Sequence, residues 1–375
     1  MVSSVTNGYA ANPYLTTTGT AAANTAATTT SLDASNAAAA KTGGSSVNVT
    51  LSAEAQAALA AQTDTRTTDA VVGAARTALD KLLADAKATS ALKDGKATID
   101  VSGLDRRSLY AIASNKGGKF SIEEQVVASL QLKANRDAAL SASASAMRVT
   151  GDYTGLYKAA LANLEAAGPE EKAMGQWAKD KAALTEGLKQ ATEKPGVQPK
   201  GIEGDPVAAY LKDTGGVVAN PRTRDIEKVA SDVRSVLNKQ YAAATKDGMA
   251  TGPDDGQIDF SKFDDRSLAA VALNKGDQFS DHEVAQAAAE MRTRNRDSVS
   301  GAYNSTKGSS DPSAFGKTLI TQYASMSDEE RQAAGWSPAL YDKMIAMQNL
   351  SDKLASMFNS DGSVNSGGTS LLDYL

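Results

Sequence analysis

The sequence predicts a mainly α-helical fold, in which two homologous units follow a disordered N-terminal arm. Three observations support this fold class. Apolar residues recur at helical spacing in both halves of the chain. A set of motifs in the first half returns in the second half at a constant offset. Residues 1–62 consist mostly of Ala, Thr, Ser, Asn and Gly, a composition typical of disorder.

Composition narrows the classes of function. The 375 residues are enough for two domains. A net charge of -5 and a pI near 5.2 provide no basic field for nucleic acid, so we expect no nucleic-acid partner. The chain has no cysteine, and His282 is its only histidine, which excludes thiolate zinc sites and most triads. No apolar run reaches the roughly 18 residues of a membrane span, so we expect no integral membrane association.

The N-terminal arm, residues 1–62, offers too little apolar surface to offset the ordering entropy of roughly 1–2 kcal/mol per residue. No Lys or Arg precedes an apolar stretch there, so the arm does not match a Sec signal peptide. We therefore expect either a cytoplasmic protein or one secreted by a non-Sec route.

The internal repeat is the most informative feature. The motif from Asp105 to Glu124 contains Arg107, Ser108, Leu109, Asn115, Gly117, Phe120 and Ser121, and it returns as Asp264, Arg266, Ser267, Leu268, Asn274, Gly276, Phe279, Ser280 and Glu283. The same offset carries Trp177 onto Trp336. Upstream, the apolar residues Val72, Ala75 and Leu79 match Ile226, Val229 and Val233 at a smaller shift, which an insertion at 247–255 would explain.

These matches divide the chain into the disordered arm, a first unit, a linker, a second unit and a flexible tail. The first unit spans 66–190 and the second unit spans 224–358. The Pro- and Gly-rich segment 191–223 between them is predicted to be a linker with at most one short helix, near Val207–Leu211. The Ser- and Gly-rich tail 359–375 is expected to be flexible.

Each unit is predicted to begin with an amphipathic helix and a Gly/Asp loop. A short helix near Ser102 or Ser261 then separates two β-like stretches, which we expect to pair as a two-stranded ribbon. These stretches are centred on Ile99 and Phe120 in the first unit and on Ile258 and Phe279 in the second. Capping boxes are predicted at Ser121–Glu124, Ser280–Glu283 and Ser327–Glu330, each at the start of a helix.

This succession of helix, loop, β residue and helix resembles a degenerate EF-hand layout. With Phe120 and Phe279 as the hydrophobic loop residues, Glu124 and Glu283 fall at position 12, where an EF-hand has its bidentate ligand. The resemblance implies a calcium site in the second unit, with the candidate ligands Asp254, Asp255, Asp259 and Glu283. Both units depart from the pattern, because positions 1, 3 and 5 are Ala113, Asn115 and Gly117 in the first and Ala272, Asn274 and Gly276 in the second. The more acidic upstream loop of the second unit has Lys262 at position 12. The alternative, which we prefer, is that Glu124 and Glu283 only cap their helices.

Three other features have a structural and a functional interpretation. His282 is interpreted as a surface residue without chemistry, since no second histidine or cysteine can join it. Arg107 and Arg266 either pair with carboxylates at their own helix start, which we prefer, or contact an acidic partner. Trp177 and Trp336 are interpreted as the largest core residues of their units, the alternative being anchors of a binding surface.

These patterns favour a non-catalytic structural or interaction protein of bacterial type, with a protein partner and no cofactor. The charge-free Ser/Thr/Asn/Ala-rich N-terminus resembles those of type III or flagellar-export substrates. The Ser/Gly tail with its apolar end resembles type I secretion signals. The alternative function is a calcium sensor or buffer that uses the EF-hand-like loops. No motif indicates an enzyme.

Overall fold

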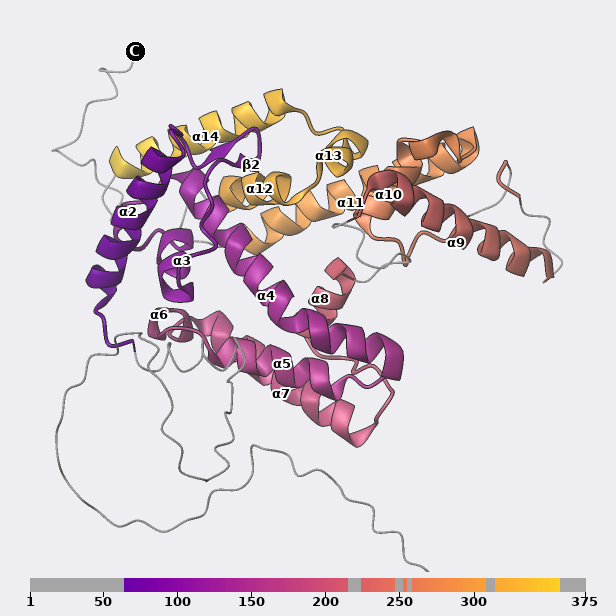
Figure 1. The fold of residues 1–375 in the computed structure, drawn as a ribbon, viewed down its shortest axis with the longest axis horizontal. Helices are drawn as coiled ribbons and strands as arrows, with labels where there is room; N and C mark the ends of the chain where they lie inside the picture. Colours follow the sequence, from indigo (N-terminus) through magenta and orange to yellow (C-terminus); the bar gives the residue numbers. More distant parts are fainter. Residues whose placement is uncertain (1–63, 215–223, 247–251, 255–257, 308–313, 358–375) are drawn as a thin grey trace, which may run out of the picture. The chain divides into compact units, whose positions relative to one another are not determined.

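A computed structural model describes residues 64–214, 224–246, 252–254, 258–307 and 314–357 (Figure 1). These residues are mainly helical, as predicted, with one small two-stranded antiparallel sheet. They all belong to one compact unit, Leu51–Leu375. The predicted disordered arm 1–62 and flexible tail 359–375 lie outside the described residues.

The first half of the described chain contains seven α-helices: α2 (Thr68–Asp85), α3 (Arg106–Ala113), α4 (Ile122–Thr150), α5 (Thr154–Glu165), α6 (Pro169–Lys172), α7 (Gly175–Glu193) and α8 (Pro206–Thr214). Side-chain caps fix where several of them begin. The Asp105 side chain accepts from the amide of Ser108 at the start of α3. Ser121 and Glu124 form the predicted capping box of α4.

In the second half, the described helices are α9 (Ile226–Lys246), α10 (Asp265–Ala272), α11 (Asp281–Thr306), α12 (Ala314–Ser325), α13 (Asp328–Ala334) and α14 (Pro338–Met357). The predicted capping boxes of α11, at Ser280 and Glu283, and of α13, at Ser327 and Glu330, are confirmed. Asp264 caps α10 in the same way as Asp105 caps α3.

The loops before α4 and α11 have the same backbone geometry. Asn115 and Asn274 both adopt the left-handed conformation, with φ of 49° and 45°, and each precedes a single 3₁₀ turn. The Asn115 side chain accepts from the amide of Phe120 at 3.0 Å, and the Asn274 side chain accepts from the amide of Phe279 at 2.9 Å. Asparagine suits this position, because its short side chain can bond the backbone of its own turn.

The predicted β-ribbons are not where the sequence placed them. The one described sheet pairs β1 (Leu92–Lys93) with β2 (Lys96–Ala97) around an Asp94-Gly95 turn in which both residues have positive φ. A local hairpin with an Asp-Gly turn forms more readily than a ribbon between Ile99 and Phe120, which a helix separates. Ile99 and Phe120 are buried outside any strand.

The second unit has no strand within its described residues, and Ile258 and Phe279 are likewise buried in loop conformations. Segments 247–251 and 255–257 lie outside the described residues. The EF-hand-like layout, which required a ribbon in each unit, is therefore not confirmed.

The match between α2 and α9 differs by one helical turn from the residue pairing that the sequence suggested. The buried residues of α2 are Val71, Val72, Ala75 and Leu79, and those of α9 in the same order are Val229, Ala230, Val233 and Leu237. Val72 thus matches Ala230 and not Ile226. Residues one turn apart share a helix face, so an apolar pattern alone cannot fix this register.

Two hydrophobic cores organise the described residues. The larger core combines side chains of α2, α3 and the start of α4 with side chains of α9 to α14. The smaller core joins the C-terminal half of α4 to α5, α7 and α8, and Figure 1 shows these four helices together. The helix predicted near Val207–Leu211 is α8, and a hydrogen bond from Tyr157 to Asp205 fixes its start to α5.

Within the described residues, none of the helices combines the length and the apolarity that crossing a bilayer requires.

Candidate functional site: a cavity in the first unit

The two predicted position-12 glutamates are buried in ion pairs with arginines. Arg76 donates from two nitrogens to the two oxygens of Glu124, each at 2.7 Å. In the second unit, the same nitrogen of Arg234 lies 2.8 Å from both oxygens of Glu283. Tyr241 also donates to Glu283, at 2.7 Å, and this contact together with burial raises the pKa of Tyr241. Both glutamates therefore join the first helix of their unit to the capped helix.

The three candidate calcium ligands that the structure describes, Asp254, Asp259 and Glu283, do not form an acidic cluster. Glu283 is fully buried, with its oxygens bonded to Arg234, Tyr241 and the Ser280 amide. Asp259 is exposed, and hydrogen bonds from Ser261 lower its pKa. Asp254 is exposed, and Asp255 lies outside the described residues. Across the described ranges, no three acidic or histidine side chains form a group that could hold a metal ion.

Arg107 and Arg266 do not pair with carboxylates at their own helix start, so the preferred interpretation was wrong. Arg107 forms a bidentate pair with Glu170, at 2.8 and 2.6 Å, and Arg266 contacts Glu329 at 3.3 Å. The carboxylates of Asp105 and Asp264 are taken by the amides and hydroxyls of Ser108 and Ser267. Arg107 and Arg266 thus pair with glutamates later in the chain, and Arg107 also contacts Asp64, at 3.2 Å.

The two tryptophans have different environments. Trp336 is buried in the larger core, where its ring stacks on Tyr323. Trp177 is only half-buried, donates to the carbonyl of Leu164 and lies under the ammonium of Lys181. The core interpretation is confirmed for Trp336 and is wrong for Trp177. The half-buried His282 lies against Gln286 on the next turn of α11.

A cavity of about 910 Å³ lies in the first unit, between α3, α4, α5 and the start of α6. Its volume is within the range of small-ligand sites, roughly 300–1,000 Å³. The apolar part of the wall consists of Leu104, Leu132, Ala138, Ala139, Ala162 and Ala166. The charged part of the wall consists of Asp64, Arg66, Asp105, Arg106, Arg107, Lys133, Arg136 and Glu171.

Ion pairs hold the charged rim in place. Arg106 binds Glu171 through two nitrogens, at 3.0 and 2.6 Å, and also donates to the carbonyl of Asn163. The bond from Arg107 lowers the pKa of Glu170 to about 2. Hydrogen bonds from Arg66 hold the pKa of Asp64 well below its ordinary value. These carboxylates are thus charged at neutral pH and fix the arginines beside the cavity.

The rim has more donors than its own acceptors use. Each guanidinium offers five N–H groups. Arg136, 40% exposed, contacts only one oxygen of its neighbour Asp137 through two nitrogens in the described structure. Arg66 uses two of its three nitrogens on Asp64 and Asp105. N–H donors of Arg66 and Arg136 therefore remain available at the cavity.

The second unit fills the corresponding space with larger side chains. Counted from the capping serine, Phe263 stands where the first unit has Leu104, and Arg294 stands where it has Asn135. Phe263 is buried and packs edge-on against Phe260. Arg294 reaches across to the carbonyls of Phe263 and Phe260, at 2.7 and 2.8 Å. Leu104 and Asn135 lack these ring and guanidinium atoms, which leaves open space.

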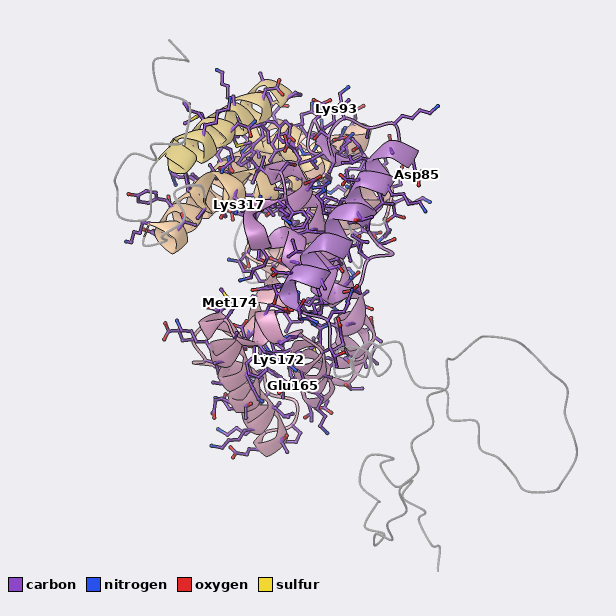
Figure 2. The ribbon with its side chains drawn as sticks, turned by 90° about the vertical axis from the view of Figure 1, so that its left-hand side faces the viewer. Asp85, Lys93, Glu165, Lys172, Met174 and Lys317 are labelled. Carbon is purple, nitrogen blue, oxygen red and sulfur yellow. The ribbon has the colours of Figure 1, made fainter. Side chains whose placement is uncertain are left out.

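The helices that close the two units also differ. In the second unit, Ser327 caps α13, which packs directly against α10 and adds Ala333 and Ala334 to the larger core. In the first unit, Gly168 stands at the cap position, and α6 ends after a single turn. Met174, where the second unit has Ala333, is 49% exposed in the turn before α7 (Figure 2).

Comparisons with protein-family models, with curated proteins and with solved structures gave no match to this chain.

The sequence reasoning missed the cavity, although its signal was present. Leu104 against Phe263 and Asn135 against Arg294 are mismatches within otherwise matching segments. A pair of large-to-small differences at equivalent positions indicates a packing change, but only coordinates show that the two positions border one space.

Proposed function

We propose that this chain is a non-catalytic interaction protein made of two copies of one helical module, of which the first copy binds a protein partner and the second has a structural role. The proposal is supported by the recurrence of local geometry: the left-handed Asn115 and Asn274, the capped helices that follow, and the buried pairs of Arg76 with Glu124 and of Arg234 with Glu283.

One observation carries the proposal, namely that the first unit has a cavity at the positions where the second unit has the larger Phe263 and Arg294. An apolar pocket with a polar rim is the usual form of a recognition site. Every charged side chain of the cavity wall belongs to an ion pair, an arrangement that favours a fixed binding surface over acid–base chemistry.

A photo-crosslinking experiment tests this role. Because the chain has no native cysteine, a single introduced cysteine is labelled specifically. In the full chain, Ala166→Cys on the cavity wall is labelled with a benzophenone maleimide and irradiated in an extract of the native cells or medium. The matched control carries the label at Ser325→Cys, the equivalent position of the second unit. A discrete crosslinked protein is expected from Ala166→Cys alone.

The crosslink must also depend on the cavity. Adding Leu104→Phe and Asn135→Arg, which introduces the residues of the second unit, is expected to abolish it. Equal crosslinking from labelled Ala166→Cys with and without this closure, or equal crosslinking from both label positions, would overturn the proposed role of the cavity.

The compartment where such a partner is met is a separate expectation, namely the cytoplasm or the medium after non-Sec export. Fractionating a native culture into cells and medium distinguishes the two. The protein in the medium with its N-terminus intact supports export without a cleaved signal.

A further inference from the structure

We infer that the cavity between α3, α4 and α5 recognises one chemical group: an apolar body about the size of an aromatic ring with an anionic oxygen group beside it. The inference rests on the proposed binding function and specifies what the site takes. A free amphiphilic acid presents this chemistry, and so does a partner segment in which Asp or Glu flanks Phe or Leu.

The apolar body follows from what fills the second unit. There, the ring of Phe263 occupies the space next to α11 and lies edge-on to Phe260, with ring centroids 5.1 Å apart. In the first unit, Leu104 and the alanines of α4 and α5 border that space instead. A ligand ring placed there would restore the apolar contacts, each buried methylene being worth about 0.8 kcal/mol.

The anionic group follows from the rim. Arg66, Arg106 and Arg136 border the cavity, and the carboxylates that they contact are all engaged. The unused N–H groups of Arg66 and Arg136 point to an acceptor, and an oxyanion forms the stronger, charge-assisted bond. The wall carries five cationic side chains and three carboxylates, a balance that disfavours a cationic ligand.

The position of the polar groups separates this site from a uniform apolar patch. Arg136 lies one residue after Asn135 on α4, so the donor is on the helix that also contributes Ala138 and Ala139. An amphiphile can thus place its apolar end on Leu104 and the alanines while its oxygens contact Arg136. Binding should depend on both parts of the ligand.

The test uses the purified full chain and 8-anilinonaphthalene-1-sulfonate, whose aromatic rings and sulfonate have this chemistry and whose fluorescence rises on binding. One dye per chain is expected. Two competitors of equal chain length and opposite charge are compared below their micellar concentrations: dodecanoate is expected to displace the dye, and dodecyltrimethylammonium is not. Displacement by both competitors alike would overturn the inference of an anion site.

Variants locate the site. The double variant Leu104→Phe/Asn135→Arg is expected to weaken dye binding by at least about tenfold, because it places a ring and a guanidinium in the space that the ligand would occupy. Arg136→Glu, a surface change that leaves the packing intact, is expected to weaken binding by about tenfold. Its matched control is Arg296→Glu on the exposed face of α11, which should stay within about twofold. Circular dichroism checks that each variant is folded.

Unchanged dye affinity in Arg136→Glu would overturn the inference even if the double variant failed to fold. The source of the ligand is resolved by a further competitor, the peptide acetyl-Asp-Leu-Phe-Asp-amide. Displacement by this peptide supports a partner segment, and displacement by dodecanoate alone supports a free amphiphile. Dye binding at the cavity without any protein crosslink would uphold the chemistry of the site and remove the protein partner from the proposed function.

Discussion

The guanidinium of Arg331 on α13 donates a hydrogen bond of 3.2 Å to the carbonyl oxygen of Gly95, which lies 236 residues earlier in the chain. A second nitrogen of Arg331 donates to the carbonyl of Asp94, at 3.3 Å. The same guanidinium lies over the ring of Tyr323, which stacks on Trp336 and Tyr341. The hairpin of the first unit is therefore seated on an aromatic surface of the second.

The contact of this hairpin with Tyr323 predicts that a methyl group added at Gly95 destabilises the fold. A Cβ at Gly95 would come 2.5 Å from Cε1 of the buried Tyr323 ring, and the φ of 74° disfavours any side chain. We expect Gly95→Ala to lower the free energy of unfolding by about 2–3 kcal/mol. Urea denaturation of the full chain measures the change.

The matched control is Gly118→Ala, whose φ of 65° is also positive but whose Cβ would meet nothing within 4 Å. It isolates the backbone strain, which we expect to cost about 1 kcal/mol. Equal losses in the two variants would show that the hairpin does not press on Tyr323.

The buried pair of Arg234 and Glu283 predicts a large loss from a nearly isosteric change. Glu283→Gln leaves the guanidinium without its charged partner in a site where Glu283 has no exposed surface. We expect the free energy of unfolding to fall by about 3 kcal/mol. The equivalent Glu124→Gln should cost less, because Arg76 also pairs with Asp80, at 2.8 Å, and would keep that charged partner. The reverse order in thermal or urea denaturation would contradict this account.

The lowered pKa of Glu170 predicts a decline of stability in acid. Its folded-state pKa of about 2 is below the ordinary 4.5, so the ionised carboxylate stabilises the fold at higher pH. This stability is expected to disappear as the pH falls from about 4.5 to about 2. Asp64 shifts in the same direction and adds to the decline. Urea midpoints measured across this range should therefore decrease.

Glu170→Gln should be less stable than the wild type at neutral pH. This difference in the free energy of unfolding should shrink toward zero as the pH approaches about 2. Glu165→Gln is the control, since Glu165 and Lys181 form an ion pair in which both side chains are over 40% exposed. A Glu170→Gln variant that follows the wild-type curve at every pH would refute the role of the Arg107 pair.

The contacts of Glu283 predict that calcium does not bind there. Coordination would have to displace Arg234, Tyr241 and the Ser280 amide from the same two oxygens. We expect no shift of the thermal midpoint when calcium is added to the full chain. A calcium-dependent rise that Glu283→Gln abolished would restore the sensor hypothesis; a rise that Asp259→Asn abolished would place a site in the exposed loop.

Local chemistry explains which parts of this fold the sequence could predict. The capping boxes at Ser121, Ser280 and Ser327 were predictable, because side chain and backbone interact within one turn. The asparagine turns also depend on neighbouring atoms, and their recurrence is visible in the sequence. Helix existence followed from apolar spacing for the same reason.

Parts that depend on distant contacts could not be predicted. The predicted register between α2 and α9 was wrong by one helical turn, because a shift of one turn leaves an apolar stripe nearly unchanged. The order of the buried residues and the pairing of Arg234 with Glu283, on different helices, fix it. The ion pair of Arg107 with Glu170 spans 63 residues, and the cavity needs residues of four helices, so neither has a local signature.

The docking of α12 against α4 has a consequence for truncation of this protein. A chain cut within the segment before α9 would retain every helix of the first unit but would uncover the apolar side chains of α4 and β1 that the later helices shield. Such fragments should aggregate, because they expose apolar surface. The intact chain should unfold in one cooperative transition, because both units contribute side chains to the larger core.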